Sequence, residues 1–205
     1  MVRKLWIAVV LAVSSSFGLV GCGEAEVGPA TPEARIANSL AEYFQRTLEL
    51  QNPSPLEREV IERAIVAGQL DPADYEAAHS RYAQCMAEHG FDLSFRKTPD
   101  GLYIELPNID NTGHRDTTAA SLECDRDNGL IMALYRTQQA NPGLLADNRL
   151  TAIQCLQRSG FVDADYTVDD FERDQSTDTF PFDQYETGPN NCLCQAGYAY
   201  FSVEG

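Results

Sequence analysis

Apolar side chains in the first half of the chain recur at helical spacing in three successive segments. Between residues 33 and 51 they return every three or four positions, and a run rich in Asn and Pro follows. Ser54 and Gly68 are start and stop signals for a second helix, because they are typical N-cap and C-terminal residues. Asp71 begins a third amphipathic segment that ends at Gly90. The pattern predicts three consecutive helices.

The period changes to two over residues 91–106, and a Thr-Pro-Asp-Gly run interrupts it in the middle. This alternation predicts a β-hairpin. Helical spacing returns over residues 115–139 and 144–160, and a short helix is expected at 167–171. Residues 174–191 are rich in Asp, Thr, Gln and Pro and are expected to form a loop. The predicted fold class is mainly α with one β-hairpin (α+β).

The N-terminal segment is organised like an export signal. Arg3 and Lys4 precede an uncharged apolar stretch at residues 5–20, which is shorter than the roughly 20 residues that a membrane-spanning helix needs. The stretch ends in Leu19-Val20-Gly21-Cys22, which resembles the lipobox of bacterial lipoproteins. An ordinary secretory signal, with Cys22 left as a plain thiol, is the alternative interpretation.

The lipobox resemblance implies that Cys22 receives a diacylglycerol and becomes the first residue of the mature chain. Residues 1–21 would then be a lipoprotein signal peptide, and residues 22–32 a lipidated, flexible tether rich in Gly and Pro. Two acyl chains hold a protein at a membrane where one does not. The predicted location is the extracytoplasmic face of the cell membrane.

The net charge of the chain limits the classes of partner that it is expected to bind. Without residues 1–21 the chain keeps 13 basic residues against 31 acidic ones, a net charge of −18. Such a charge repels phosphate polymers and anionic headgroups, so no nucleic-acid partner is expected, and the lipid must anchor the protein without a polybasic segment. Solubility explains the acidity more simply than cation binding does.

Five cysteines remain once Cys22 is lipidated, in a compartment that permits disulfides. We predict the pairs Cys85–Cys124 and Cys155–Cys194, because both enclose the same sequence separation. Cys192 is the unpaired residue or the alternative partner of Cys155. A metal site at Cys192 and Cys194 lacks a suitable second pair of ligands, so no metal is expected.

A seven-residue pattern of Cys, a large apolar residue, three variable positions, Gly and Phe occurs at residues 85–91 and again at 155–161. It suggests two similar modules, residues 33–139 with the hairpin and a smaller one at residues 140–205. A duplication and a shared type of helix end remain alternatives. The segment 60–91, with its helix, Gly turn, acidic Tyr-bearing helix, Cys and Gly, resembles a group of uncharacterised actinobacterial exported proteins and lipoproteins. That resemblance implies a fold and a compartment, and it carries over no catalytic residue.

No motif of the chain indicates catalysis or a cofactor. Residues 108–113 follow the start of a calcium loop, but Ala119 stands where the bidentate Glu is required, so we interpret them as a polar loop. His89 lies at a helix end, where capping explains it better than catalysis. No catalytic residue is predicted, since nucleophile, phosphate-loop and zinc-protease motifs are absent from the sequence.

The sequence thus predicts a lipid-anchored, disulfide-stapled helical protein that acts as a non-enzymatic binding or envelope-associated module. Its partners would be the membrane, through the lipid, and an envelope protein or a small-molecule ligand. An extracytoplasmic hydrolase with a carboxylate-based site is the alternative, and two close carboxylates in a deep cleft would favour it.

Overall fold

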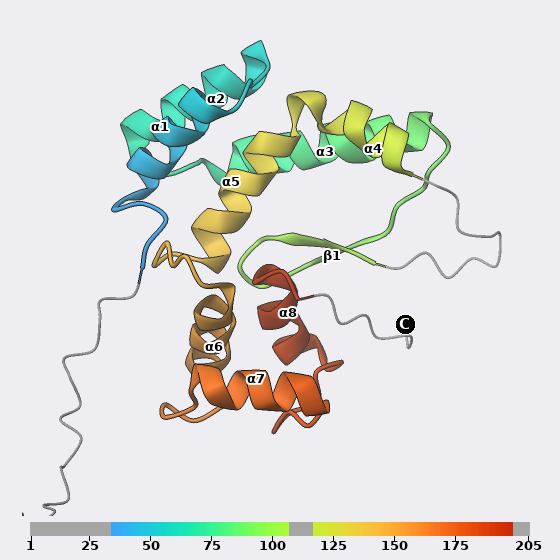
Figure 1. The fold of residues 1–205 in the computed structure, drawn as a ribbon. Coiled ribbons are helices and arrows are strands. Elements are labelled where there is room, and N and C mark those ends of the chain that lie inside the picture. Colours follow the sequence, from blue (N-terminus) through green and yellow to red (C-terminus); the bar gives the residue numbers. More distant parts are fainter. Residues whose placement is uncertain (1–33, 107–116, 199–205) are drawn as a thin grey trace, which may run out of the picture. The chain divides into compact units, whose positions relative to one another are not determined.

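A computed structural model describes residues 34–106 and 117–198. These residues form helices and one two-stranded antiparallel sheet, so the protein is mainly helical with one hairpin, as predicted (Figure 1). The elements are α1 (Leu40–Leu50), α2 (Pro55–Ala67), α3 (Pro72–Glu88), β1 (Phe95–Lys97), β2 (Tyr103–Glu105), α4 (Thr118–Cys124), the 3-10 helix η1 (Asp125–Asp127), α5 (Gly129–Ala140), α6 (Asn148–Arg158), α7 (Val168–Thr177) and α8 (Thr187–Gln195). Cys22, the lipobox-like sequence at 19–22 and the predicted polar loop at 108–113 lie outside the described residues.

Helices α2 and α3 begin where their caps predict. Ser54 and Glu57 form a capping box at the start of α2, and Gly68 ends that helix with a positive φ of 75°. Asp71 accepts a hydrogen bond from the backbone N–H of Ala73 at the start of α3. Each signal acts within one turn of its helix, and for this reason the sequence pattern locates both ends.

The first helix starts later than its apolar spacing suggests. It begins at Leu40, capped by Ser39, rather than near residue 33. Upstream, Arg35 pairs with Leu145 in an antiparallel bridge, and the N–H of Ile36 donates to the carbonyl of Leu144. This long-range pairing satisfies backbone groups that a longer helix would have used, and local periodicity cannot reveal it.

The hairpin is shorter than its alternating pattern. Only three residues on each strand pair, with Arg96 opposite Ile104 at the centre. The turn is closed by the Thr98 N–H donating to the Leu102 carbonyl, and Gly101 takes a φ of 86° that other residues rarely adopt.

The predicted helix over residues 115–139 is divided into α4, η1 and α5. Asn128 causes the division, since its side chain donates to the Cys124 carbonyl and accepts from Arg81 of α3. Asn side chains compete in this way with helical backbone bonds. Gly129 then begins α5.

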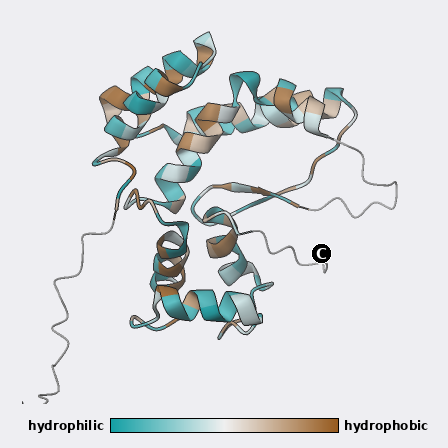
Figure 2. Cartoon of the chain, in the orientation of Figure 1, coloured by the Kyte–Doolittle hydropathy of each residue, from teal (hydrophilic) through white to brown (hydrophobic). Residues whose placement is uncertain are grey.

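The expected loop over residues 174–191 is wrong at both ends. Helix α7 continues to Thr177 after a capping box between Thr167 and Asp170, and α8 begins at Thr187. Pro189 lies in the first turn of α8, where a missing N–H costs little. Figure 2 shows that α7 is mostly hydrophilic. Because this helix buries only one side, its polar composition resembles that of a loop.

The ends of α3 and α6 have the same local structure. The N–H of Phe91 donates to the Met86 carbonyl at 2.9 Å, and the N–H of Phe161 donates to the Leu156 carbonyl at 2.9 Å. The glycine before each Phe has a positive φ. The repeated sequence pattern therefore encodes a Schellman-type helix end in both places, and a duplication remains a hypothesis.

Two groups of buried side chains form the main apolar cores. One joins α1, α2, α3 and α5, and the other joins α6, α7 and α8, which Figure 1 shows grouped together. Fully buried residues at their centres are Phe44, Ile61, Leu70, Ile131, Leu134, Leu156, Phe171 and Leu193. A smaller cluster of Met86, Ala120 and Cys124 packs α3 against α4.

Glu57 is a buried carboxylate that caps two helices, and its side chain is important for stability. It is 3% exposed, and its oxygens accept hydrogen bonds from the N–H of Ser54 at 3.0 Å and of Leu130 at 2.9 Å. Glu57→Ala leaves both donors without this acceptor, so the free energy of unfolding in urea should fall by about 3 kcal/mol. Glu57→Gln, which keeps one carbonyl oxygen, should lose less. Glu59→Ala, on the exposed side of the same helix, should change it by less than about 0.5 kcal/mol. An equal loss in the Glu57 and Glu59 variants would contradict the capping role.

Candidate functional site

A cleft lies between β2, α5 and α8. Its volume is about 220 Å³, below the usual 300–1,000 Å³ range of sites for drug-sized ligands, so it suits a small molecule. Strand β2 and the residue before it form one wall, α5 contributes a cation, and α8 with the turn after it forms the opposite wall. The lining residues are Leu102, Tyr103, Ile104, Glu105, Arg136, Cys194, Gln195 and Gly197.

The hairpin turn is joined directly to the end of α8. The Gln195 side-chain N–H group donates to both carboxylate oxygens of Asp100, at 3.1 and 2.9 Å. Asp100 lies in the turn that precedes β2, and Gln195 is the last residue of α8. These hydrogen bonds hold the two walls of the cleft together at one end.

A stack of aromatic rings supports β2. The ring of Tyr103 stacks on His79 with centroids 3.8 Å apart, and Tyr75 stacks on Tyr135 at 4.3 Å. The hydroxyl of Tyr75 accepts from the backbone N–H of Tyr103 at 2.9 Å, and the Tyr103 hydroxyl donates to Glu76 at 2.7 Å. Tyr103 is thus fixed at both its backbone and its hydroxyl.

Burial makes this stack a neutral environment for its histidine. The His79 pKa is lowered, chiefly because burial disfavours the charged imidazolium, although Glu76 acts in the opposite direction. Within the described part of the chain, the Nε2 atom of His79 is buried without a hydrogen-bond partner. His79 therefore packs as a neutral ring behind the cleft.

The cleft is lined by one cationic, one acidic and one thiol side chain, which are Arg136, Glu105 and Cys194. Arg136 is exposed and forms no ion pair with a carboxylate of the described residues. Glu105 is exposed, and partial desolvation of its carboxylate by neighbouring protein atoms raises its pKa. Cys194 is a free, half-buried thiol whose Sγ lies 3.4 Å from the side-chain oxygen of Asn190. Among the described lining residues only Glu105 is a carboxylate, whereas the hydrolase hypothesis calls for two close carboxylates.

The structure confirms the Cys85–Cys124 disulfide, and for the second pair it shows the alternative partner of Cys155 in place of the preferred Cys194. Cys155 is bonded to Cys192, at a sequence separation of 37, and Cys194 is the free thiol. The reason is that the segment is a helix: residues two apart lie on nearly opposite faces. Cys192 is 3% exposed and faces the core with α6, whereas Cys194 faces the cleft. The two disulfides indicate an oxidising, extracytoplasmic compartment.

No local sequence pattern predicts a functional role for Tyr103, Arg136 or Gln195. They come from three elements separated by tens of residues, and no local spacing connects them. The available signal was the odd number of cysteines that the predicted lipidation of Cys22 would leave, which predicted one free thiol without placing it in a cleft.

Comparison with protein-family models, with curated proteins and with solved structures finds no match to this chain.

Proposed function

We propose that the protein is a lipid-anchored, extracytoplasmic binding module that holds a small carboxylate ligand in the cleft between β2, α5 and α8. The cleft is the observation that carries this proposal. Leu102, Tyr103 and Ile104 supply an apolar and aromatic wall, and the guanidinium of Arg136 supplies a positive charge beside it. Few well-placed polar groups on a mostly apolar lining are typical of small-molecule sites.

Arginine is suited to the charged end of such a ligand. Its planar guanidinium can donate two parallel hydrogen bonds to one carboxylate, and these charge-assisted bonds are about twice as strong as neutral ones. Glu105 lines the same cleft, so its ionised form repels an anion. Because its pKa is raised, Glu105 becomes neutral at a higher pH than an ordinary Glu, and ligand affinity should increase as pH falls.

The membrane location rests on the N-terminal sequence. Cys22 would carry the lipid, and the acidic residues that follow would keep the folded part away from anionic headgroups. No helix within residues 34–106 and 117–198 is long and apolar enough to cross a membrane. Lipid at Cys22 supplies the anchor in this proposal, and the cleft then meets ligands outside the cytoplasm.

Benzoate is a suitable first probe, because it combines an aromatic ring with one carboxylate, and benzamide is its uncharged counterpart. We expect calorimetry to detect benzoate binding and to show much weaker binding of benzamide. Arg136→Ala should weaken benzoate binding by about 10- to 100-fold, the value of a hydrogen bond to a charged group. Arg58→Ala, which removes an exposed Arg of α2 outside the cleft, is the matched control and should leave affinity unchanged.

Cys194 provides an independent measure of occupancy. Its thiol lines the cleft, so bound benzoate should slow its labelling by a maleimide. Equal binding of benzoate and benzamide, equal losses in the Arg136 and Arg58 variants, or unchanged labelling would each contradict the proposed site.

A further inference from the structure

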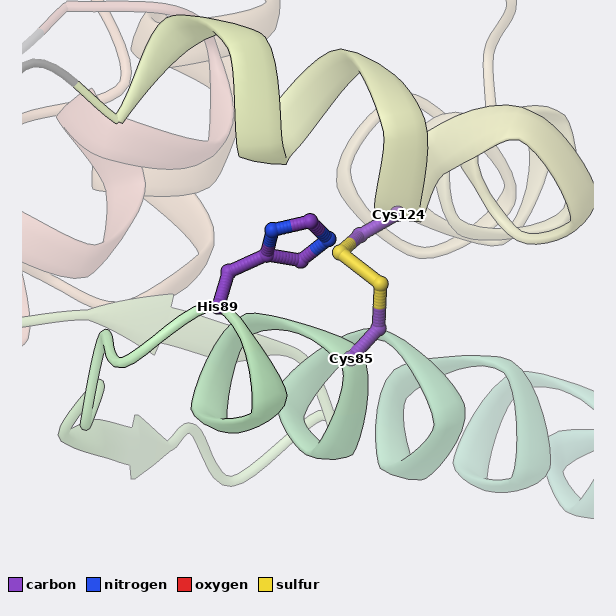
Figure 3. A group of neighbouring side chains, drawn as sticks. All are labelled: Cys85, His89 and Cys124. Atoms are coloured by element: carbon purple, nitrogen blue, oxygen red, sulfur yellow. A yellow bond between two sulfur atoms is a disulfide. The ribbon is translucent and has the colours of Figure 1, made fainter.

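A second group of side chains has the composition of a metal site. Cys85 and His89 lie one turn apart at the end of α3, and Cys124 is the last residue of α4. Their two sulfurs and one imidazole nitrogen lie within 4.8 Å of one another. Figure 3 shows the His89 ring beside the disulfide, with one ring nitrogen directed at the sulfurs. The Nε2 atom of His89 also lies 3.7 Å from a carboxylate oxygen of Glu123.

We propose that reduction of the Cys85–Cys124 disulfide converts this group into a Zn²⁺ site, with the two thiolates, His89 and Glu123 as ligands. The reductant is a dithiol. It gives two electrons and two protons to the disulfide and becomes a disulfide itself, while Cys85 and Cys124 become thiols. Zn²⁺ then binds both sulfurs as thiolates and releases the two thiol protons.

The two sulfurs and the His89 nitrogen are close to the separations that one Zn²⁺ ion requires. Zinc bonds are about 2.3 Å to sulfur and about 2.0–2.2 Å to nitrogen and oxygen, so neighbouring ligands of a tetrahedral ion are about 3.3–3.8 Å apart. The His89 Nε2 atom and the Glu123 carboxylate oxygen, at 3.7 Å, lie near this separation, and rotation of the exposed Glu123 side chain would bring its carboxylate to the ion. The Cα atoms of the two cysteines are 5.6 Å apart, so after reduction rotation of the two side chains can separate the sulfurs.

The two helices have contacts that do not depend on the disulfide. Met86 and Ala120 pack in the apolar cluster between α3 and α4, and Tyr82 lies against it. The Tyr82 hydroxyl donates to the Ser121 hydroxyl at 3.5 Å. These contacts favour a preformed ligand set once the sulfurs are reduced. Cys85 is half-buried, so a dithiol can reach the bond from its side.

The other disulfide is an internal comparison. Cys155 stands before the same type of helix end as Cys85, but Ser159 occupies the position that corresponds to His89. The Ser159 hydroxyl lies 3.9 Å from the Cys192 sulfur, and Cys194 faces the cleft instead. Histidine is a common zinc ligand and serine is not, so the chemistry assigns the site to the first disulfide alone.

Co²⁺ is the probe for this site, because tetrahedral Co²⁺ bound to thiolates absorbs strongly in the visible and near-ultraviolet regions. We expect the mature chain, reduced under anaerobic conditions, to bind one equivalent of Co²⁺ with these bands, and Zn²⁺ to displace it. The oxidised chain should show no such bands. His89→Ser, which copies the residue at the second disulfide, should weaken Co²⁺ binding by at least about tenfold.

Paired cysteine variants identify the thiolates. Cys85→Ala/Cys124→Ala should abolish the bands, and Cys155→Ala/Cys192→Ala should retain them. Circular dichroism of each reduced variant shows whether it is folded. Unchanged affinity in His89→Ser, bands that survive in Cys85→Ala/Cys124→Ala, or binding by an unfolded chain without dependence on His89 would overturn the proposal.

Discussion

Replacing Cys22 with Ala is expected to move the protein from the membrane fraction to the soluble fraction of a bacterial host that processes lipoproteins. The two acyl chains on Cys22 would supply the membrane affinity, since each buried methylene contributes about 0.8 kcal/mol. The rest of the chain is strongly acidic, and no membrane-spanning helix occurs within the part that the structure describes. Detergent phase partitioning, with mass analysis of the N-terminal peptide, measures the change.

Two controls separate the lipid from other causes of membrane association. Cys194→Ser replaces a cysteine that no disulfide uses, so that protein should stay with the membrane. An uncleaved signal could itself retain the Cys22→Ala protein, so a second version should carry Cys22→Ala behind an ordinary secretory signal. Retention of this second version, or an N-terminal peptide of the unaltered protein without diacylglycerol, would refute the anchor.

The elements that the sequence predicted well are those whose signals are local. Helix α2 has its cap at Ser54, its reciprocal partner at Glu57 and its stop at Gly68, all within the helix or next to it. The helix ends at Gly90 and Gly160 are similar cases, since a glycine with positive φ and a following Phe determine the backbone there. At these helix ends, neighbouring residues all favour the same backbone structure, and this is sufficient to predict where the helix ends.

The elements that were missed depend on distant contacts. Helix α8 has a glycine, a proline and two asparagines in its nine residues, so its intrinsic preference for helix is weak. It is stabilised by burial of Leu193 against α6 and α7 and by the bond from Cys192 to Cys155. Tertiary packing therefore overrides local preference, and the sequence pattern indicates a loop.

The two candidate sites also depend on residues that are distant in sequence, so local patterns do not predict them. Arg136 and Cys194 reach the cleft from α5 and α8, and His89 meets Cys124 across 35 positions of sequence. The sequence pattern predicts His89 at a helix end, which agrees with its place at the end of α3. Its approach to a disulfide could be known only once α3 and α4 were placed side by side.

Removing either disulfide is expected to lower the free energy of unfolding by about 4 kcal/mol, because the closed loops are of nearly equal length, at separations of 39 and 37 residues. The crosslink limits the conformations of the unfolded chain, and this entropic effect grows slowly with loop length. Total stabilities are ordinarily about 5–15 kcal/mol, so each loss is a large fraction of the whole. Urea unfolding of Cys85→Ala/Cys124→Ala and of Cys155→Ala/Cys192→Ala measures it.

Cys194→Ser is the matched control for this prediction, and it distinguishes the observed pairing from the one expected from sequence. Cys194 is free and half-buried, so its replacement should change the free energy of unfolding by less than about 0.5 kcal/mol. If Cys155 were bonded to Cys194 instead, Cys194→Ser would cost as much as losing the whole crosslink, and Cys192→Ser would cost only the packing of a small buried side chain. Non-reducing peptide mapping should recover Cys155 joined to Cys192. Among the cysteines from Cys85 onward, a thiol reagent should label only Cys194. Recovery of a Cys155–Cys194 peptide, together with a large loss in Cys194→Ser, would overturn the helical placement of Cys192 against α6 as well as the position of a free thiol in the cleft.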